Sequence, residues 1–245
     1  MNSADIYVLK ESIRLVENKV RRDFVELENL QSTRKNVNFV NSTLEYLNDR
    51  LYSFLIEKRP KYAINIKGYK EKPSENTEFS IYVNSLCGIN NLLHGIPYFA
   101  TVISLAKNSE VVAGLVNNYA GNETFVAMYG KGAFVNDRRI RVSNRTMEDS
   151  ALVAIKQDRS GKLFREIISK FSNFRINSCY ALDFCCVACG KYDASVVFGG
   201  GEEELKLGAL FSIEAGGLYQ KIGESGNDMI FSNYILLDSI KNIIV

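Results

Sequence analysis

Apolar positions at helical spacing dominate the start of the chain. An apolar side chain recurs every three or four residues there, at Ile6, Leu9, Ile13, Val16, Val20 and Phe24. This period predicts a long amphipathic helix. A second helix is predicted to begin near Ser42, because Ser42 and Glu45 form a Ser-x-x-Glu capping box. Its apolar stripe consists of Leu44, Leu47, Leu51, Phe54 and Leu55.

The pattern then changes to short segments that are rich in Val, Ile, Tyr and Phe. Five of them predict strands, at 62–66, 78–83, 98–106, 110–117 and 123–129. Turn residues at 108–109 and 121–122 punctuate these five segments, which favours an antiparallel meander. Further along, the pattern predicts helices at 161–172, 179–190, 202–215 and 237–243, and strands at 193–198, 218–222 and 229–231. Helices followed by strands and then by mixed elements indicate an α+β fold.

The composition is that of an ordinary globular protein. The chain has 245 residues, of which 46% are hydrophobic and 24% are charged, and its formal net charge is +2. Such a length can bury the core of one large domain or of two fused halves. The small charge gives no reason to expect direct nucleic-acid binding. No apolar run is long enough to span a bilayer and no signal peptide opens the sequence, so we expect a cytoplasmic protein without a membrane partner.

The cysteines, the histidine and a glycine run are candidates for other chemistry. Four of the five cysteines lie within 179–189, which favours free thiols over a disulfide framework. Cys186 and Cys189 form a Cys-x-x-Cys pair without a second pair, so core packing is expected rather than zinc. The single histidine, His94, is expected to pack or to cap a helix. The glycines at 199–201 precede three glutamates that would repel an anion, which favours a turn over a phosphate site.

Residues 82–97 carry a pattern that is distinctive for one family. They read Tyr-Val-Asn-Ser-Leu-Cys-Gly-Ile-Asn-Asn-Leu-Leu-His-Gly-Ile-Pro. This resembles the signature of the inositol monophosphatase superfamily, usually Val-Ile-Asp-Pro-Ile-Asp-Gly-Thr-Thr-Asn-Phe-Val-His-Gly-Ile-Pro. The frame matches at Gly88, Asn91, His94, Gly95, Ile96 and Pro97.

Four other segments extend the resemblance over nearly the whole chain. Residues 130–143 are similar to the family's Gly-Lys-Gly-Ala-Phe-Leu-Asn-Gly-Arg-Arg-Ile-Arg-Val-Ser, and residues 178–193 to Ser-Ala-Ala-Leu-Asp-Leu-Ala-Tyr-Val-Ala-Ala-Gly-Arg-Tyr-Asp. Residues 208–217 resemble Gly-Ala-Leu-Leu-Val-Arg-Glu-Ala-Gly-Gly, and residues 23–31 resemble the bacterial SuhB-type (extragenic suppressor) branch. The resemblance implies the layered αβαβα sandwich of the inositol monophosphatase and fructose-1,6-bisphosphatase type, and a homodimer. It also implies a single domain over 1–245, with halves at 1–150 and 151–245.

The resemblance implies a phosphatase that uses magnesium, an ion that prefers carboxylate oxygens. The family's metal-binding glutamate falls at Lys67, the two signature aspartates at Asn84 and Cys87, and the carbonyl between them at Leu86. A late aspartate falls at Glu204. The family positions that orient water fall at Leu44 and Ile89, and the position that binds the polyol falls at Val197. Gly88 and Asn90 lie in the signature after the position of the second aspartate. Most of the reactive groups are therefore replaced.

Two functions follow from these replacements. The first is a catalytically inactive member that acts as a binding or regulatory protein and needs no cofactor. The SuhB branch implies RNA polymerase or elongation factors as its partners, through ribosomal RNA antitermination. The second is a residual Mg²⁺-dependent phosphatase acting on inositol-1-phosphate or a related monoester. Its site would be rebuilt from Glu202, Glu203 or Glu204, with Asn84 and Leu86 as weak oxygen donors. At most two of three consecutive carboxylates on a helix can share a pocket.

Overall fold

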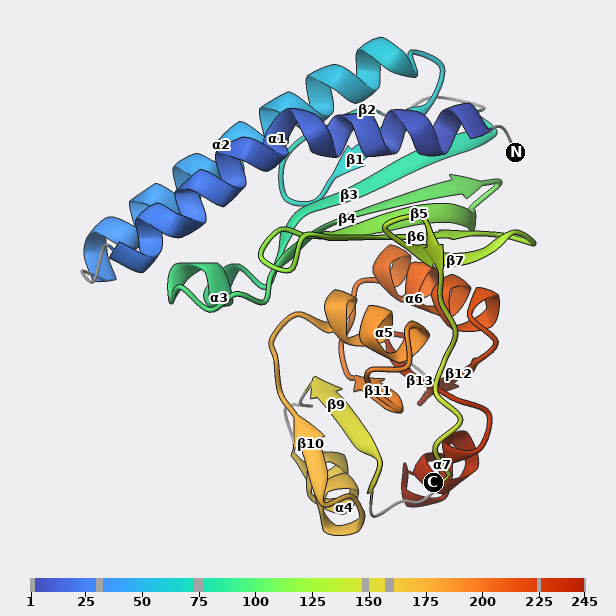
Figure 1. The fold of residues 1–245 in the computed structure, drawn as a ribbon. Helices are drawn as coiled ribbons and strands as arrows, with labels where there is room; N and C mark the ends of the chain where they lie inside the picture. The colour runs from blue at the N-terminus through green and yellow to red at the C-terminus, as the bar shows by residue number, and fades with distance from the viewer. Residues whose placement is uncertain are drawn as a thin grey trace. The chain divides into compact units, whose positions relative to one another are not determined.

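The structure is a computed structural model that describes residues 3–29, 33–72, 77–146, 150–156, 161–223 and 226–244. The chain divides into two compact units, Met1–Thr124 and Phe125–Val245. Each unit has its own helices and its own strands (Figure 1). In the described part of the chain, no helix combines the length and the apolar character needed to cross a membrane.

Two long helices open the N-terminal unit. Helix α1 spans Ser3–Asn29, and the apolar positions that predicted it are buried at Ile6, Leu9, Ile13, Val16 and Val20. Helix α2 spans Thr33–Lys58, so its predicted start near Ser42 is wrong. Ser42 lies inside the helix, where its hydroxyl donates to the Asn38 carbonyl oxygen at 3.0 Å. A serine hydroxyl that bonds one turn back is compatible with a helix interior, so the apparent capping box does not mark the start.

The N-terminal unit contributes five strands to an eight-stranded sheet, and these strands lie under the two helices. Its strands are β1 (Ala63–Ile66), β2 (Glu71–Lys72), β3 (Phe79–Cys87), β4 (Ala100–Lys107) and β5 (Glu110–Asn118), in the order β2-β1-β3-β4-β5. Strands β3, β4 and β5 form an antiparallel meander as predicted, whereas β1 pairs with β3 in parallel, so the antiparallel pairing predicted for 62–66 is wrong. Figure 1 shows α1 and α2 side by side along one face of this sheet.

The turn between β4 and β5 has the backbone that a tight hairpin requires. Asn108 and Ser109 have φ angles of 49° and 69°, both in the left-handed region. Two-residue hairpin turns of the primed types use this region, and asparagine tolerates it better than most residues. The register places Lys107 opposite Glu110, so these two residues form the whole loop. The turn predicted at 108–109 is confirmed.

The C-terminal unit has a second sheet of five strands. They are β9 (Leu152–Lys156), β10 (Asn173–Arg175), β11 (Ala194–Val197), β12 (Leu218–Ile222) and β13 (Asp228–Ser232), in the order β10-β9-β11-β13-β12. Strands β9 and β11 are parallel, and β13 is antiparallel to both β11 and β12. Before this sheet, β6 (Glu123–Met128) pairs with β7 (Gly132–Val135), and β7 pairs with β8 (Arg138–Arg139).

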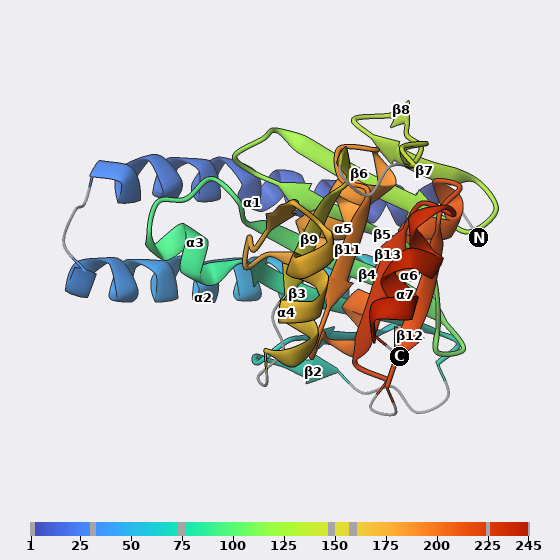
Figure 2. The same cartoon turned by 90° about the horizontal axis from the view of Figure 1, so that it is seen from below.

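Helices cover both faces of the second sheet. Helices α4 (Lys162–Lys170) and α7 (Leu236–Ile244) contribute Ile167 and Ile240 to an apolar cluster with the sheet residues Val153, Val196 and Ile230. Helices α5 (Tyr180–Ala188) and α6 (Glu202–Glu214) pack on the opposite face (Figures 1 and 2). The ring of Phe184 there lies 5.8 Å from the ring of Phe211 and 5.6 Å from that of Phe231. The unit is therefore a sheet between two helical layers.

The later predicted elements match the structure closely, and several short elements were missed. Helix α6 ends just before Gly216, whose φ of 83° is left-handed, as the predicted glycine stop requires. The sequence pattern did not predict β2, β7, β8, β9, β10 or the short helix α3 (Ile89–Leu93). All of these elements span five residues or fewer, which is too short for a hydrophobic period to be recognised.

Candidate functional site

The signature segment forms a strand, a sharp turn and a short helix. Strand β3 ends at Cys87, and Gly88 follows with φ 84° and ψ 32° as the N-cap residue of α3. Only glycine adopts this left-handed conformation without steric cost. The pairing of β3 with β4 shifts between Asn84, opposite Val102, and Cys87, opposite Ala100. This bulge interrupts the regular ladder at the positions where the family pattern has its two aspartates.

The side chains at this bulge are neutral. Asn84 is half-buried, and its Oδ1 accepts a hydrogen bond from the Leu86 backbone N–H at 3.2 Å. Leu86 and Cys87 are buried, and Cys87 forms no disulfide. A neutral amide oxygen and a buried thiol carry no formal charge to attract a divalent cation.

The surviving residues of the signature shape the backbone that follows. Asn91 is buried, and its Nδ2 donates to the Tyr98 carbonyl oxygen at 2.6 Å. His94 is the C-cap residue of α3 with an exposed side chain, which confirms the expected capping position. Ile89 and Asn90, at the start of α3, are exposed. The retained residues of this segment therefore hold the turn, and the replaced ones face solvent or line the bulge.

The two other N-terminal candidates lie on separate elements of the same unit. Lys67 directly follows β1; its side chain is exposed, and its backbone N–H donates to the Val83 carbonyl oxygen at 2.9 Å. This bond places Lys67 beside the middle of β3. Leu44 lies on α2 and is half-buried. Neither side chain offers an oxygen ligand.

The candidate carboxylates of the C-terminal unit lie in the first turn of α6. Lys206 pairs with both Glu202 and Glu203, with Nζ–Oε1 distances of 2.9 and 3.1 Å. The hydrogen bond from Lys206 holds the pKa of Glu202 below its ordinary value. Glu204 is buried, and it accepts a hydrogen bond from the hydroxyl of Tyr180 instead. The three consecutive carboxylates therefore do not converge, as the helical geometry predicts.

The remaining candidates of this unit serve the core. Val197 is fully buried in β11, the position at which the resemblance places a polyol-binding glutamate. None of the five cysteines forms a disulfide, which confirms the expected thiols. Cys186 is buried on α5, and the Cys189 thiol lies 3.5 Å from the Cys186 carbonyl oxygen. The expectation of core packing agrees with these contacts.

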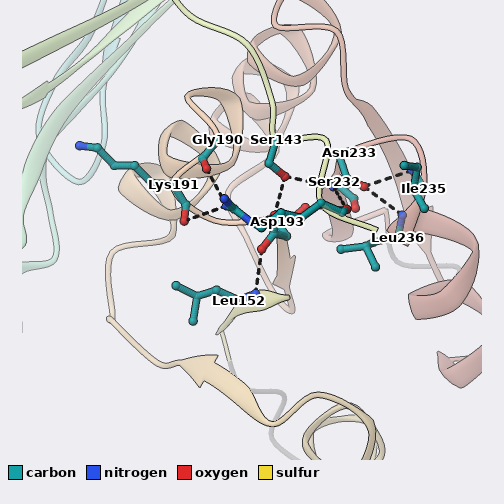
Figure 3. A network of polar contacts seen from close by, with 10 residues as sticks. Ser143, Leu152, Gly190, Lys191, Asp193, Ser232, Asn233, Ile235 and Leu236 are labelled. Atoms are coloured by element: carbon teal, nitrogen blue, oxygen red, sulfur yellow. Dashed lines mark hydrogen bonds and ion pairs between the residues drawn. The ribbon is translucent and has the colours of Figure 1, made fainter. Parts of the chain in front are cut away.

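A polar network around Asp193 was missed by the sequence interpretation (Figure 3). The Asp193 carboxylate is fully buried and accepts hydrogen bonds from the Ser143 hydroxyl, from Arg145 Nε at 2.8 Å and from the Leu152 N–H at 2.9 Å. Asn233 donates to the Ser143 hydroxyl at 3.1 Å, and its Oδ1 accepts bonds from the backbone N–H groups of residues 235 and 236 at the start of α7. Asp193 ends the Gly-x-Tyr-Asp part of the family pattern, so this motif has a structural use here.

Comparison with known proteins identifies the relatives of this chain. The model of the "Inositol monophosphatase family" matches residues 2–239. An inositol-1-monophosphatase of Mesorhizobium japonicum is 29% identical over 237 residues, which cover 93% of this chain and 89% of that protein. A Nus factor SuhB of Pseudomonas aeruginosa is 32% identical over 161 residues, which cover 62% and 59%.

Solved structures give the same result. The crystal structure of the extragenic suppressor protein SuhB from Bartonella henselae superposes with a TM-score of 0.88. It is 27% identical and covers 99% of both chains. The expected α+β fold of the inositol monophosphatase type is thereby confirmed.

Proposed function

The chain belongs to the inositol monophosphatase family, and from this premise we propose that it is a member without catalytic activity that acts as a binding or regulatory protein. The observation that carries the proposal is the pair Asn84 and Cys87, at the bulge where the family signature has two aspartates. The Asn84 oxygen already accepts the Leu86 N–H, and the Cys87 sulfur is a soft donor. Magnesium prefers carboxylate oxygens and water, so this donor set does not fit the ion.

Other positions support the same proposal. Lys67 brings a positive charge to a family ligand position, and Ile89 brings an apolar side chain to the position that orients water. The Glu204 carboxylate accepts the Tyr180 hydroxyl. Among the described residues of each unit, no group of three or more His, Cys, Asp and Glu side chains is placed to hold a metal ion.

The partner side of the proposal rests on the relatives. The Pseudomonas aeruginosa relative is named a Nus factor, and the Bartonella henselae structure carries the SuhB name as well. We infer a regulatory contact with the transcription machinery, either with RNA polymerase or with an elongation factor. The proposal also places the protein in the cytoplasm as a homodimer, as the family resemblance implies.

A residual phosphatase is the second candidate. The Mesorhizobium japonicum relative is named an inositol-1-monophosphatase and aligns with 93% of this chain. Activity on inositol-1-phosphate or a related monoester would need a site rebuilt around Glu202 or Glu204. One carboxylate with neutral donors would bind Mg²⁺ more weakly than a cluster of carboxylates does.

Phosphate release decides between the two candidates. The full chain is assayed with inositol-1-phosphate in the presence of Mg²⁺ or Mn²⁺, and both metals are titrated calorimetrically into the same protein. We expect no metal-dependent turnover and no binding at millimolar metal. The double variant Asn84→Asp/Cys87→Asp is the matched control, and it is expected to gain a heat of metal binding. Turnover by the unmodified chain would show that the proposal is wrong.

The partner is tested separately with purified components. The full chain is mixed with RNA polymerase, with and without purified elongation factors, and each mixture is resolved by gel filtration. Co-elution supports the transcription role. If the protein elutes alone in every mixture, the inferred partner is wrong, although the absence of catalysis is unaffected. The mass of the protein alone, measured by light scattering, tests the homodimer.

A further inference from the structure

A buried tyrosine contacts the carboxylate at the position where the family pattern has a metal-binding aspartate. Tyr180 is the first residue of α5, and Glu204 lies in the first turn of α6. The Tyr180 hydroxyl donates to Glu204 Oε2, and the Gly201 backbone N–H donates to the Tyr180 oxygen at 3.1 Å. The two side chains are 8% and 6% exposed. The phenol therefore uses both its donor and its acceptor within a water-poor contact.

The ring of Tyr180 is held from a third element. Lys156, at the end of β9, places its Nζ atom 4.9 Å from the centre of the Tyr180 ring. The same Nζ atom donates to the Gly199 carbonyl oxygen. A cation at this distance from an aromatic face is attracted by the ring quadrupole. Lys156 thus joins the ring to the turn that precedes α6.

Two departures from the family pattern match each other at this contact. The pattern that residues 178–193 resemble has alanine where this chain has Tyr180, and the late aspartate position holds Glu204. An alanine has no hydroxyl to donate. The turn also accommodates the carboxylate closely, because a Cβ at Gly201 would lie 3.1 Å from Glu204 Oε1. Tyr180 supplies the donor that alanine lacks, and Glu204 supplies the acceptor.

We propose that the Tyr180 hydroxyl takes the place of a metal ion as a partner of the Glu204 carboxylate, so that this end of α6 keeps its structure without a divalent cation. A buried carboxylate is costly unless it is paired or hydrogen-bonded. A hydroxyl that donates to a carboxylate forms a strong, charge-assisted hydrogen bond, which meets this need. The inference rests on the proposed absence of metal catalysis and names the group that replaces the ion.

Thermal unfolding of full-length variants tests the pair. The midpoint of unfolding is measured in EDTA and in millimolar MgCl2 for the unmodified protein, Tyr180→Phe, Glu204→Asp and the double variant. We expect the unmodified protein to unfold at the same temperature in both buffers. Each single variant should have an unfolding midpoint several degrees lower. The midpoint of the double variant should be no lower than that of the less stable single variant, because both changes remove one shared contact. Tyr219→Phe, which removes an exposed hydroxyl in the same unit, is the control and should leave the midpoint unchanged.

A further variant separates geometry from charge. Glu204→Gln keeps the length of the side chain and an oxygen that accepts the hydroxyl, whereas Glu204→Asp keeps the charge but shortens the reach. The proposed pair predicts that Glu204→Gln is the milder change, and a metal-ligand role for Glu204 predicts the reverse order. The inference is overturned if MgCl2 stabilises the unmodified protein, if the two single changes add, or if Glu204→Asp is the milder variant.

The outcome of this experiment tests the inference separately from the proposed function. If the protein releases phosphate but its unfolding midpoint is the same in EDTA and in MgCl2, the proposed absence of catalysis is wrong and the Tyr180–Glu204 inference is unaffected. An inactive protein that MgCl2 stabilises would refute the pair and leave the binding role standing.

Discussion

Replacing Asp193 by asparagine should destabilise the protein more than most conservative changes. The three donors to its buried carboxylate divide between the two oxygens: Oδ1 accepts the Ser143 hydroxyl and Arg145 Nε, and Oδ2 accepts the Leu152 N–H. An asparagine offers one oxygen and one NH2 group. Whichever way its amide turns, the NH2 group faces at least one of these donors, and a hydrogen bond becomes a donor–donor contact.

The expected magnitude follows from two losses. A buried donor without a partner costs about 1–3 kcal/mol. The ion pair with Arg145 adds a smaller amount, because the side chain of Arg145 is 44% exposed and water screens the interaction. We expect Asp193→Asn to lower the free energy of unfolding by about 2–4 kcal/mol. For a chain of this size the unfolding midpoint should fall by about 5–15 °C.

Urea denaturation followed by circular dichroism measures this loss. Asp228→Asn is the matched control, since Asp228 is only half-buried and one oxygen accepts the Gly199 N–H at 2.7 Å. An asparagine there can keep that bond, so a loss below about 1 kcal/mol is expected. If Asp193→Asn costs no more than the control, the network does not contribute as its geometry implies. If Arg145→Gln costs as much as Asp193→Asn, the ion pair rather than the buried hydrogen bonds dominates.

Three other predictions test the packing and titration of single residues. Burial raises the pKa of Tyr119 far above its ordinary value of 10.0, so the unfolded chain loses this proton first and the free energy of unfolding falls as the pH rises above 10. Tyr119→Phe should reduce that fall in urea midpoints measured from pH 8 to 11. Gly208→Ala should cost about 1–3 kcal/mol in the same assay, because its Cβ would lie 2.8 Å from the Phe231 ring and 2.9 Å from the Phe184 ring; a gain in stability would contradict this packing. In the native protein Cys189 should react first with a thiol reagent, and the four buried cysteines only on unfolding; fast modification of several thiols would contradict the burial.

The sequence predicted elements well where a local period decides the structure. Helix α1 repeats its apolar residues over many turns, and the structure buries them as expected. The start of α2 was predicted wrongly, because the sequence around Ser42 resembles a capping box. In the structure the Ser42 hydroxyl bonds to the Asn38 carbonyl oxygen inside the helix, which begins earlier. The parallel pairing of Ile64 with Ile81 was not predictable either, since strand pairing between distant segments leaves no trace in a local pattern.

The candidate site divides in the same way. The left-handed turn at Gly88 follows from the family frame, and the sequence itself shows an amide at Asn84 and a thiol at Cys87 where the signature that it resembles has carboxylates. The contact between Tyr180 and Glu204 joins two helices through residues 24 positions apart, so no spacing rule reveals it. The replacement of a small residue by tyrosine in the 178–193 pattern was its only signal in the sequence.

The segment around Gly88 contains residues that shape the backbone and side chains that do not. Gly88 and Asn91 are retained where the backbone must turn and where the Tyr98 carbonyl oxygen needs a donor. Changing them would disturb folding whether or not any substrate is bound. The bulge and the turn form with an amide at Asn84 and a thiol at Cys87, so neither needs a carboxylate at these positions. The backbone of this turn is therefore independent of the chemistry that the two side chains at the bulge can perform.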